Sequence, residues 1–308
     1  MAATPSHMLA MQADPQRRLR RSRNLWRGLA AIAVLGVLWA LLPAGEAEPA
    51  PGHVARLDIR GTITEDRRMI EAIDRLAGND QVRAVIVAID SPGGTVAGGE
   101  AIHAALSRVA AQKPVVATMG ATAASAGYMV ALPAARIFAR ESTITGSIGV
   151  ILQSFEASEL LARLGIRAES ITSGPLKDQP SPFRPLTEEG RAALNQLVQD
   201  MQGQFIRMVA AGRNLSEDSV RPLADGRVFS GARAREAGLI DALGGEREAR
   251  AWLAEARGIP ASLPMRAVPT RSRMERLFAA GAESLARSLA TEWLGPGLRA
   301  FWAPMTAR

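Results

Sequence analysis

The chain has 308 residues, and 47% of them are apolar, which is enough to bury a sizeable core and excludes a disordered chain. It has no cysteine, so disulfides, thiolate metal sites and cysteine nucleophiles are excluded. The net charge is +7, but six arginines against one aspartate place +5 of it in residues 1–27. The charge therefore marks a basic N-terminal tail, and nucleic-acid binding by the rest of the chain is not expected.

An uncharged apolar run at residues 28–44 follows this tail, with Trp26 before it and Trp39 near its far end. Arginines before an apolar run with tryptophans toward its edges predict a transmembrane anchor whose N-terminus is cytoplasmic. A cleaved secretory signal is the alternative, because the run is short for a membrane span. Either interpretation places the body of the protein outside the cytoplasm, after a linker at residues 45–53.

Residues 54–270 are predicted to form one α/β domain, because strand and helix patterns alternate along them. The predicted strands cover residues 54–59, 83–89, 114–118, 136–139 and 168–171, with a β-rich turn at 143–150. The predicted helices are one capped by Thr64 that continues to Leu76, one over 97–111, one around 160–164 and a long one that begins at Thr187. In this pattern, ligand sites are expected at the carboxyl ends of the strands. Residues 271–308 are predicted to form an amphipathic tail, and the sequence does not choose between packing on a neighbour and lying on a membrane.

Ser125 lies in a run of small residues, 119–128, between a predicted strand and residues that can continue as a helix. Small neighbours let a substrate backbone approach, and the first N–H groups of a helix can receive a developing negative charge. Upstream, Gly93 and Gly94 end another predicted strand and expose backbone N–H groups that suit an oxyanion hole. The alternatives are a tightly packed helix start and an ordinary turn between strand and helix.

Lys177 is one of two lysines in a chain that otherwise carries its positive charge on arginine; the other is Lys113. A buried lysine can give up its proton, whereas a guanidinium cannot. A lysine retained at position 177 therefore predicts a general base, with an incidental surface lysine as the alternative. Lys113 is expected to be the exposed end of a helix.

Five motifs, in this order, resemble the SppA-type signal peptide peptidases, which are membrane-anchored serine proteases of the Clp protease/crotonase fold, built from repeated ββα units. The motifs are Asp90-Ser-Pro-Gly-Gly94, residues 119–128, Thr143-Ile-Thr-Gly-Ser-Ile-Gly-Val150, Ser173-Gly-Pro-Leu-Lys-Asp178 and Ala224-Asp-Gly-Arg-Val228. The resemblance covers about residues 54–244. It implies a Ser125 nucleophile, a Lys177 general base, an oxyanion hole formed by Gly94 and Ala126, and a supporting role for Ser173 in orienting Lys177.

By the same resemblance, the protein is a single-pass protease of the bacterial cytoplasmic membrane, with its catalytic domain on the periplasmic or extracytoplasmic side. Its substrates are then apolar peptides, chiefly signal peptide remnants, and no cofactor or metal is implied. Short family members form ring-like oligomers, in which Ser125 of one subunit meets Lys177 of its neighbour. The family commonly has Ser-Gly-Gly where this chain has Ser125-Ala126-Gly127, which puts the backbone beside Ser125 in question.

Two alternative functions remain open from the sequence. One is a crotonase-like protein that binds an acyl-CoA thioester at the glycine turn, and the other is an inactive scaffold for membrane proteins. A Ser-His-Asp triad is disfavoured, because His7 precedes the anchor, His53 lies in the linker and His103 adjoins the apolar stripe of a helix.

Overall fold

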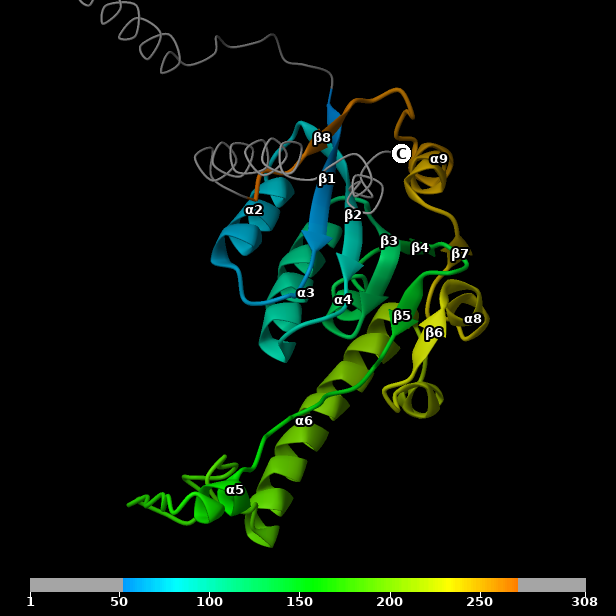
Figure 1. Cartoon of the computed structure of the whole chain (residues 1–308). Helices are drawn as coiled ribbons and strands as arrows, with labels where there is room; N and C mark the ends of the chain where they lie inside the picture. The colour runs from blue at the N-terminus through cyan, green and yellow to red at the C-terminus, as the bar shows by residue number, and fades with distance from the viewer. Residues whose placement is uncertain (1–51, 271–308) are drawn as a thin grey trace, which may run out of the picture. The chain divides into compact units, whose positions relative to one another are not determined.

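The computed structural model describes residues 52–270, in which helices cover both faces of a β-sheet (Figure 1). The strands are β1 (His53–Arg60), β2 (Val82–Ser91), β3 (Val115–Ala124), β4 (Arg136–Ala139), β5 (Ile144–Gly146), β6 (Val228–Ser230), β7 (Ala242–Leu243) and β8 (Met265–Ala267). The helices are α2 (Arg67–Ala77), α3 (Val96–Ala110), α4 (Ala126–Met129), α5 (Ser158–Arg163), α6 (Glu188–Arg213), α7 (Glu217–Val220), the short 3₁₀ helix η1 (Arg221–Leu223), α8 (Gly231–Glu236) and α9 (Glu246–Arg257). The predicted α/β class is confirmed. The predicted anchor at 28–44 and the tail at 271–308 lie outside the described residues.

The sheet has eight strands, with the order β6-β5-β3-β2-β1-β8 and with β4 pairing both β3 and β7. Neighbouring strands run parallel, except that β5 and β6 are antiparallel. Strand β2 lies inside the sheet, and its residues 84–87 are all buried, as expected for a strand covered on both faces. Because the strands are parallel, the carboxyl ends of β1, β2 and β3 lie at the same edge.

The hydrophobic core has two layers, one on each face of the sheet. The larger layer joins α2, α3, α4 and α6 to the sheet. The smaller layer packs α9 against the other face (Figure 1). Its buried residues include Leu253 of α9 together with Val54, Ile86 and Val116 of the strands. Sheet and helices together therefore hold the carboxyl ends of the strands in a fixed position.

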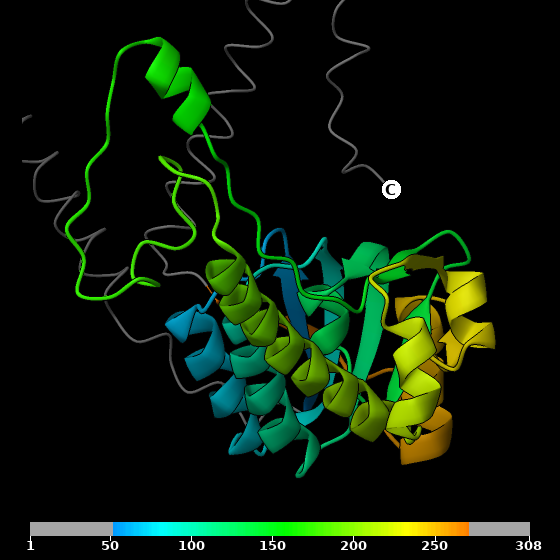
Figure 2. The ribbon, with the colours of Figure 1, turned by 90° about the horizontal axis from the view of Figure 1, so that it is seen from below.

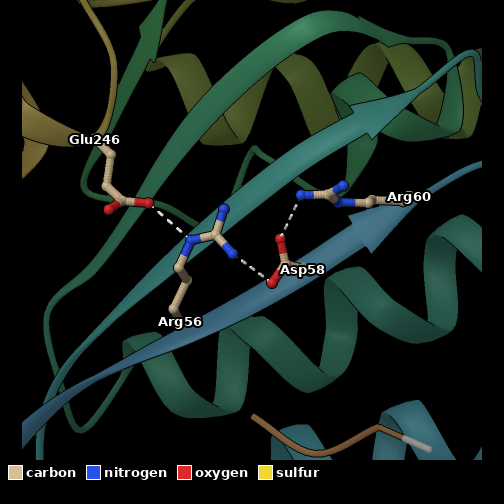
Figure 3. Close-up of polar contacts among 4 residues, drawn as sticks. All are labelled: Arg56, Asp58, Arg60 and Glu246. Carbon is tan, nitrogen blue, oxygen red and sulfur yellow. Dashed lines mark hydrogen bonds and ion pairs between the residues drawn. The ribbon is translucent and has the colours of Figure 1, made fainter. Parts of the chain in front are cut away.

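Strand β1 carries a row of charged residues on its α9 side (Figure 3). The Arg56 guanidinium donates to Glu246 at the start of α9 (2.7 Å) and to Asp58 (2.5 Å), and Arg60 also contacts Asp58 (3.4 Å). These polar side chains alternate with buried apolar ones, which explains the alternating pattern of this segment in the sequence. The ion pairs connect β1 with the N-terminus of α9.

Two predicted boundaries and one predicted strand were wrong. Helix α2 begins at Arg67 and is capped by Asp66, whose carboxylate accepts hydrogen bonds from the next turn, and not by Thr64. Strand β3 continues past residue 118 to Ala124, because β5 gives its second half a new neighbour. The strand predicted at 168–171 does not form, because that segment has no strand beside it to pair with.

Residues 152–187, which we call the arm, extend away from the sheet beside the N-terminal part of α6 (Figures 1 and 2). Of the twelve large hydrophobic residues that are exposed among those described, eight lie in the arm: Leu152, Phe155, Leu160, Leu164, Ile166, Ile171, Leu176 and Phe183. The arm therefore presents an apolar surface that residues 52–270 of the same chain do not cover. None of the helices in residues 52–270 combines the length and apolar composition needed to cross a membrane.

Candidate active site

Ser125 occupies the junction between β3 and α4, and its backbone is strained. Its φ of 54° and ψ of −122° lie in a region that residues with a side chain rarely adopt. The conformation is held by a hydrogen bond from the Ser125 N–H to the Gly146 carbonyl and by bonds from the N–H groups of Tyr128 and Met129 to the Ser125 carbonyl, all 2.9 Å. A half-buried serine at a sharp turn from strand to helix is the arrangement of a nucleophile in many hydrolases.

The glycine turn after β2 packs directly against Ser125. Gly93 has a φ of 118°, and a Cβ at this position would lie 2.8 Å from the Ser125 Cβ and 3.3 Å from its Oγ. The turn is shaped by Ser91, whose buried hydroxyl accepts a hydrogen bond from the Gly93 N–H (3.1 Å). Glycine is therefore required at position 93 for two reasons, the backbone angle and the contact with Ser125.

Two backbone N–H groups near Ser125 are free to act as donors. Ile63 lies beside Gly94 in an isolated β-bridge. In this bridge the Ile63 N–H donates to the Gly93 carbonyl (2.8 Å) and the Ile63 carbonyl accepts from the Thr95 N–H (2.9 Å), so neither bond uses the Gly94 N–H. Ala126 is the first residue of α4, where an N–H has no partner inside the helix. No acceptor within residues 52–270 binds either group. These are the two residues predicted to form the oxyanion hole.

A cleft of about 530 Å³ opens beside Ser125. Its walls come from the segment after β5, from the middle of α6 and from the loop before β6, and they are formed by Ser147, Gly149, Val150, Ile151, Val198, Gln199, Gln202, Ala224, Asp225 and Gly226. Ser147 has a positive φ of 48°, so a second strained serine shares the cleft with Ser125. The cleft has both apolar and polar walls.

The loop that closes one side of the cleft is held by side chains. Arg227 donates to both carboxylate oxygens of Asp225, and this hydrogen bonding lowers the pKa of Asp225 to about 2. From α6, the Gln202 amide donates to the Ala224 carbonyl (2.6 Å). Asp225 therefore stays ionised at neutral pH as a partner of Arg227.

Behind Ser125, buried polar bonds hold α4 in place. The Tyr128 hydroxyl donates to the Leu239 carbonyl (2.8 Å), and burial raises the pKa of Tyr128, so the phenol stays protonated. Close by in the chain, Asp241 binds the Arg213 guanidinium through both carboxylate oxygens (2.7 and 3.0 Å) and accepts the Ile137 N–H (2.7 Å). These bonds connect α4, α6 and β4 with the loop after α8.

The model of peptidase family S49 matches residues 107–260, which is half of the chain. The chain belongs to peptidase family S49. The match includes Ser125 and Lys177, and relatives named as signal peptide peptidase or Protease 4 identify an SppA-type peptidase.

Among the relatives of this S49 peptidase is a putative protease of Synechocystis sp., 40% identical over 67% of this chain and 75% of the relative. A putative signal peptide peptidase SppA of Enterococcus faecium is 34% identical over 58% of this chain and 52% of its own length. Protease 4 of Salmonella typhi is 33% identical over 72% of this chain and 34% of its own. The chain therefore matches between a third and three quarters of the length of these three relatives.

Among solved structures, a membrane-bound stomatin-specific protease aligns with 71% of the chain at 17% identity and a TM-score of 0.47. A ClpP1 mutant of Listeria monocytogenes aligns with 63% of it at 17% identity and a TM-score of 0.42.

Lys177 and Ser173 lie in the arm of this S49 peptidase, and both are exposed. Neither residue lines the cleft beside Ser125, and the arm extends away from the sheet that carries Ser125 (Figures 1 and 2). The structure of one chain therefore assembles Ser125, Gly94 and Ala126 but does not bring Lys177 to them. The assigned roles of all five residues stay predictions.

Of the five predicted site residues, only Ser125 lines the cleft. The other residues of the cleft wall, among them Ser147 and Gln202, are not predicted by the sequence. The sequence of residues 143–150 indicates only a β-rich turn, and it does not predict the positive φ of Ser147, because serine rarely adopts such an angle. Gln202 was overlooked because the apolar stripe of its helix dominated the pattern. The two histidines among residues 52–270 do not join Ser125. His53 is the first residue of β1, whereas Ser125 follows the last residue of the parallel strand β3, and His103 does not line the cleft.

Proposed function

We propose that this S49 peptidase is a serine endopeptidase in which Ser125 is the nucleophile and Lys177 of a neighbouring copy is the general base. The observation that supports this most directly is the strained turn at Ser125, which lies in an open cleft and is flanked by the free N–H groups of Gly94 and Ala126. We further propose that its fold is the Clp protease/crotonase fold. The parallel sheet and its glycine turn at the nucleophile fit this assignment.

In the proposed reaction, the Ser125 Oγ attacks the carbonyl carbon of a peptide bond while Lys177, in its neutral form, takes the hydroxyl proton. The carbonyl oxygen becomes an oxyanion, which the N–H groups of Gly94 and Ala126 stabilise. The carbon–nitrogen bond then breaks, and Lys177 passes the proton to the leaving amine. Water attacks the remaining ester by the reverse sequence and releases the acid product and the free serine.

The arm provides the reason to place the base on a neighbouring copy. It carries Lys177 away from the cleft of its own chain, and its apolar residues are exposed to a degree that a soluble surface rarely tolerates, with Ile171 at 99% and Phe155 at 78%. An arm that packs on the next copy buries these residues and delivers Lys177 to the neighbour's cleft. Ser147 lines that cleft together with Ser125, and we propose that its hydroxyl accepts a hydrogen bond from the incoming lysine. Ser173, in the same motif as Lys177, is the alternative orienting residue.

A fluorophosphonate probe, which esterifies an activated serine, tests the dyad on the purified protein. We expect wild type to be labelled and Ser125→Ala to remain unlabelled. In Lys177→Arg the labelling rate should fall by at least about 10²-fold, because arginine keeps its proton and cannot act as a general base.

Lys113→Arg is the matched control for that experiment. Lys113 donates to the backbone carbonyls of Asn79 and Val82, and it precedes the start of β3, whereas Ser125 follows the end of that strand. Arginine at position 113 preserves the charge. This variant should be labelled like wild type. Labelling that persists in Ser125→Ala, or full labelling of Lys177→Arg, would refute the dyad, and an unlabelled wild type would favour a scaffold or an acyl-CoA-binding protein.

We also propose that residues 28–44 anchor the protein in the bacterial cytoplasmic membrane, with residues 54–270 on the extracytoplasmic side, where the substrates are apolar peptides such as signal peptide remnants. The uncharged run after a basic tail supports this placement. Deleting residues 1–44 should move the protein from the membrane fraction to the soluble fraction on cell lysis. Externally added protease should cut the full chain in spheroplasts but not in intact cells; protection in spheroplasts would contradict the proposed orientation.

A further inference from the structure

The last part of β3 before Ser125 is irregular. Ile89 of β2 pairs with Met119 of β3, but the next paired residue, Ser91, lies opposite Ala123. One residue of β2, Asp90, therefore faces three residues of β3, Gly120 to Thr122. Such a bulge interrupts the regular ladder of backbone hydrogen bonds and leaves backbone groups in need of other partners.

Three side chains supply partners for backbone groups in the bulge and directly after it. The Asp90 carboxylate accepts the Thr122 N–H (3.1 Å), and the Thr143 hydroxyl donates to the Gly120 carbonyl (2.8 Å). The Thr145 hydroxyl donates to the Ala123 carbonyl (2.7 Å), two residues before Ser125.

The site is built for these bonds. Thr143 and Thr145 are among the few buried polar residues, at 1% and 0% exposure. A side chain at Gly120 would place its Cβ 3.1 Å from the Asp90 Cγ, so the glycine leaves room for the carboxylate. The bulge is therefore held by side chains from β2 and from the segment around β5.

We propose that Asp90, Thr143 and Thr145 are positioning residues that fix the β3 bulge and thereby hold Ser125 in its strained conformation. None of the three lines the cleft, so they act through the backbone. A serine with a positive φ returns to a relaxed conformation unless its surroundings determine it. The bonds to residues 120–123, followed directly by the bond from the Ser125 N–H to Gly146, provide that constraint. This inference rests on the proposed role of Ser125 as the nucleophile.

The test compares the second-order rate constant of fluorophosphonate labelling with the fraction of protein labelled at the end point. Thr145→Val removes the hydroxyl but keeps the branched shape, and Asp90→Ala removes the acceptor. We expect both to slow labelling by about tenfold or more at an unchanged end point, because a small misplacement of a reacting group costs up to about 10²-fold. Thr145→Ser and Asp90→Asn restore a hydroxyl and an acceptor oxygen, and they should label at nearly the wild-type rate.

Thr118→Val is the matched control. Thr118 lies in β3 before the bulge and is 7% exposed, and within residues 52–270 its side chain forms no hydrogen bond. Its labelling rate should equal that of wild type. A Thr145→Val protein that labels at the wild-type rate but to a lower end point would overturn the proposal, since the hydroxyl would then only stabilise the fold.

Amide hydrogen exchange tests the role of the bulge independently of the proposal that Ser125 is the nucleophile. Peptides covering residues 120–126 should exchange faster in Thr145→Val than in Thr118→Val. An unlabelled wild type refutes the nucleophile, whereas unchanged exchange in Thr145→Val refutes the bulge as the constrained element, whatever the labelling shows.

Discussion

Several residues with no chemistry of their own determine the backbone conformation of Ser125, the proposed nucleophile. Its hydroxyl is exposed to the cleft because the backbone turns sharply with a positive φ. That turn depends on contact with Gly93 on one side and on a hydrogen bond to Gly146 on the other. Both glycines have a positive φ, so the strain at the serine is shared with residues that adopt such angles at little cost.

Gly93→Ala should therefore impair Ser125 without touching the substrate. The added methyl group collides with the Ser125 Cβ and needs a φ that alanine avoids, so we expect labelling to fall by an order of magnitude or more and stability to fall by about 1–3 kcal/mol. Labelling kinetics and thermal unfolding measure the two effects. Gly78→Ala, at a position with a φ of −84° and open space around it, is the control that should keep both values. Wild-type labelling of Gly93→Ala would show that the turn does not position the serine.

Among the elements, the sequence predicts best those with a strong local pattern, either a continuous apolar run or a capped helix. Strand β2 is a nearly continuous β-branched run because both faces of the sheet are covered, and the long helix α6 begins where Thr187 caps it, as predicted. The errors lie where a partner in space decides the outcome. β3 continues to Ala124 because β5 pairs with it, and residues 168–171 form no strand because nothing pairs with them.

The same distinction applies to the candidate site. Ser125 and Gly94 could be found from the sequence, because small residues and paired glycines at strand ends have a local meaning. The bulge in β3 could not, because it arises from register between two strands 30 residues apart, and the hydroxyls of Thr143 and Thr145 acquire their function only there. Lys177 is conspicuous in the sequence because lysine is rare, but within one chain it does not line the cleft beside Ser125.

At the largest scale, residues 52–270 consist of a packed body and the arm, whose large apolar residues are mostly exposed. The body has two buried layers around the sheet, whereas α5 in the arm buries none of its residues. A contact in which the arm of one copy covers the body of the next is heterologous, and repeated contacts of this kind close into a ring when the rotation allows it. Each active site of such a ring would take its serine and its lysine from different copies.

Mixing two inactive variants tests this arrangement. Ser125→Ala chains still have Lys177, which can act on a neighbouring copy, and Lys177→Ala chains still have Ser125. Co-expressed in equal amounts and assembled at random, they should recover about a quarter of the wild-type labelling, because half of the chains have a serine and half of their neighbours have a lysine. The labelled serines should all belong to the Lys177→Ala chains, which a difference in tag length makes visible on a gel.

A control pair identifies the source of any recovered activity. Lys177→Ala chains mixed with chains that carry both substitutions have no lysine anywhere, so they should stay unlabelled even though they assemble equally well. If the first mixture also stays unlabelled while size-exclusion chromatography shows mixed oligomers, the lysine acts within its own chain. The arm would then have to fold back by a large movement to bring Lys177 to Ser125, and its apolar residues would be buried against its own body in the active protein. Recovery in the first mixture alone means instead that the isolated chain lacks a complete site and that assembly creates it.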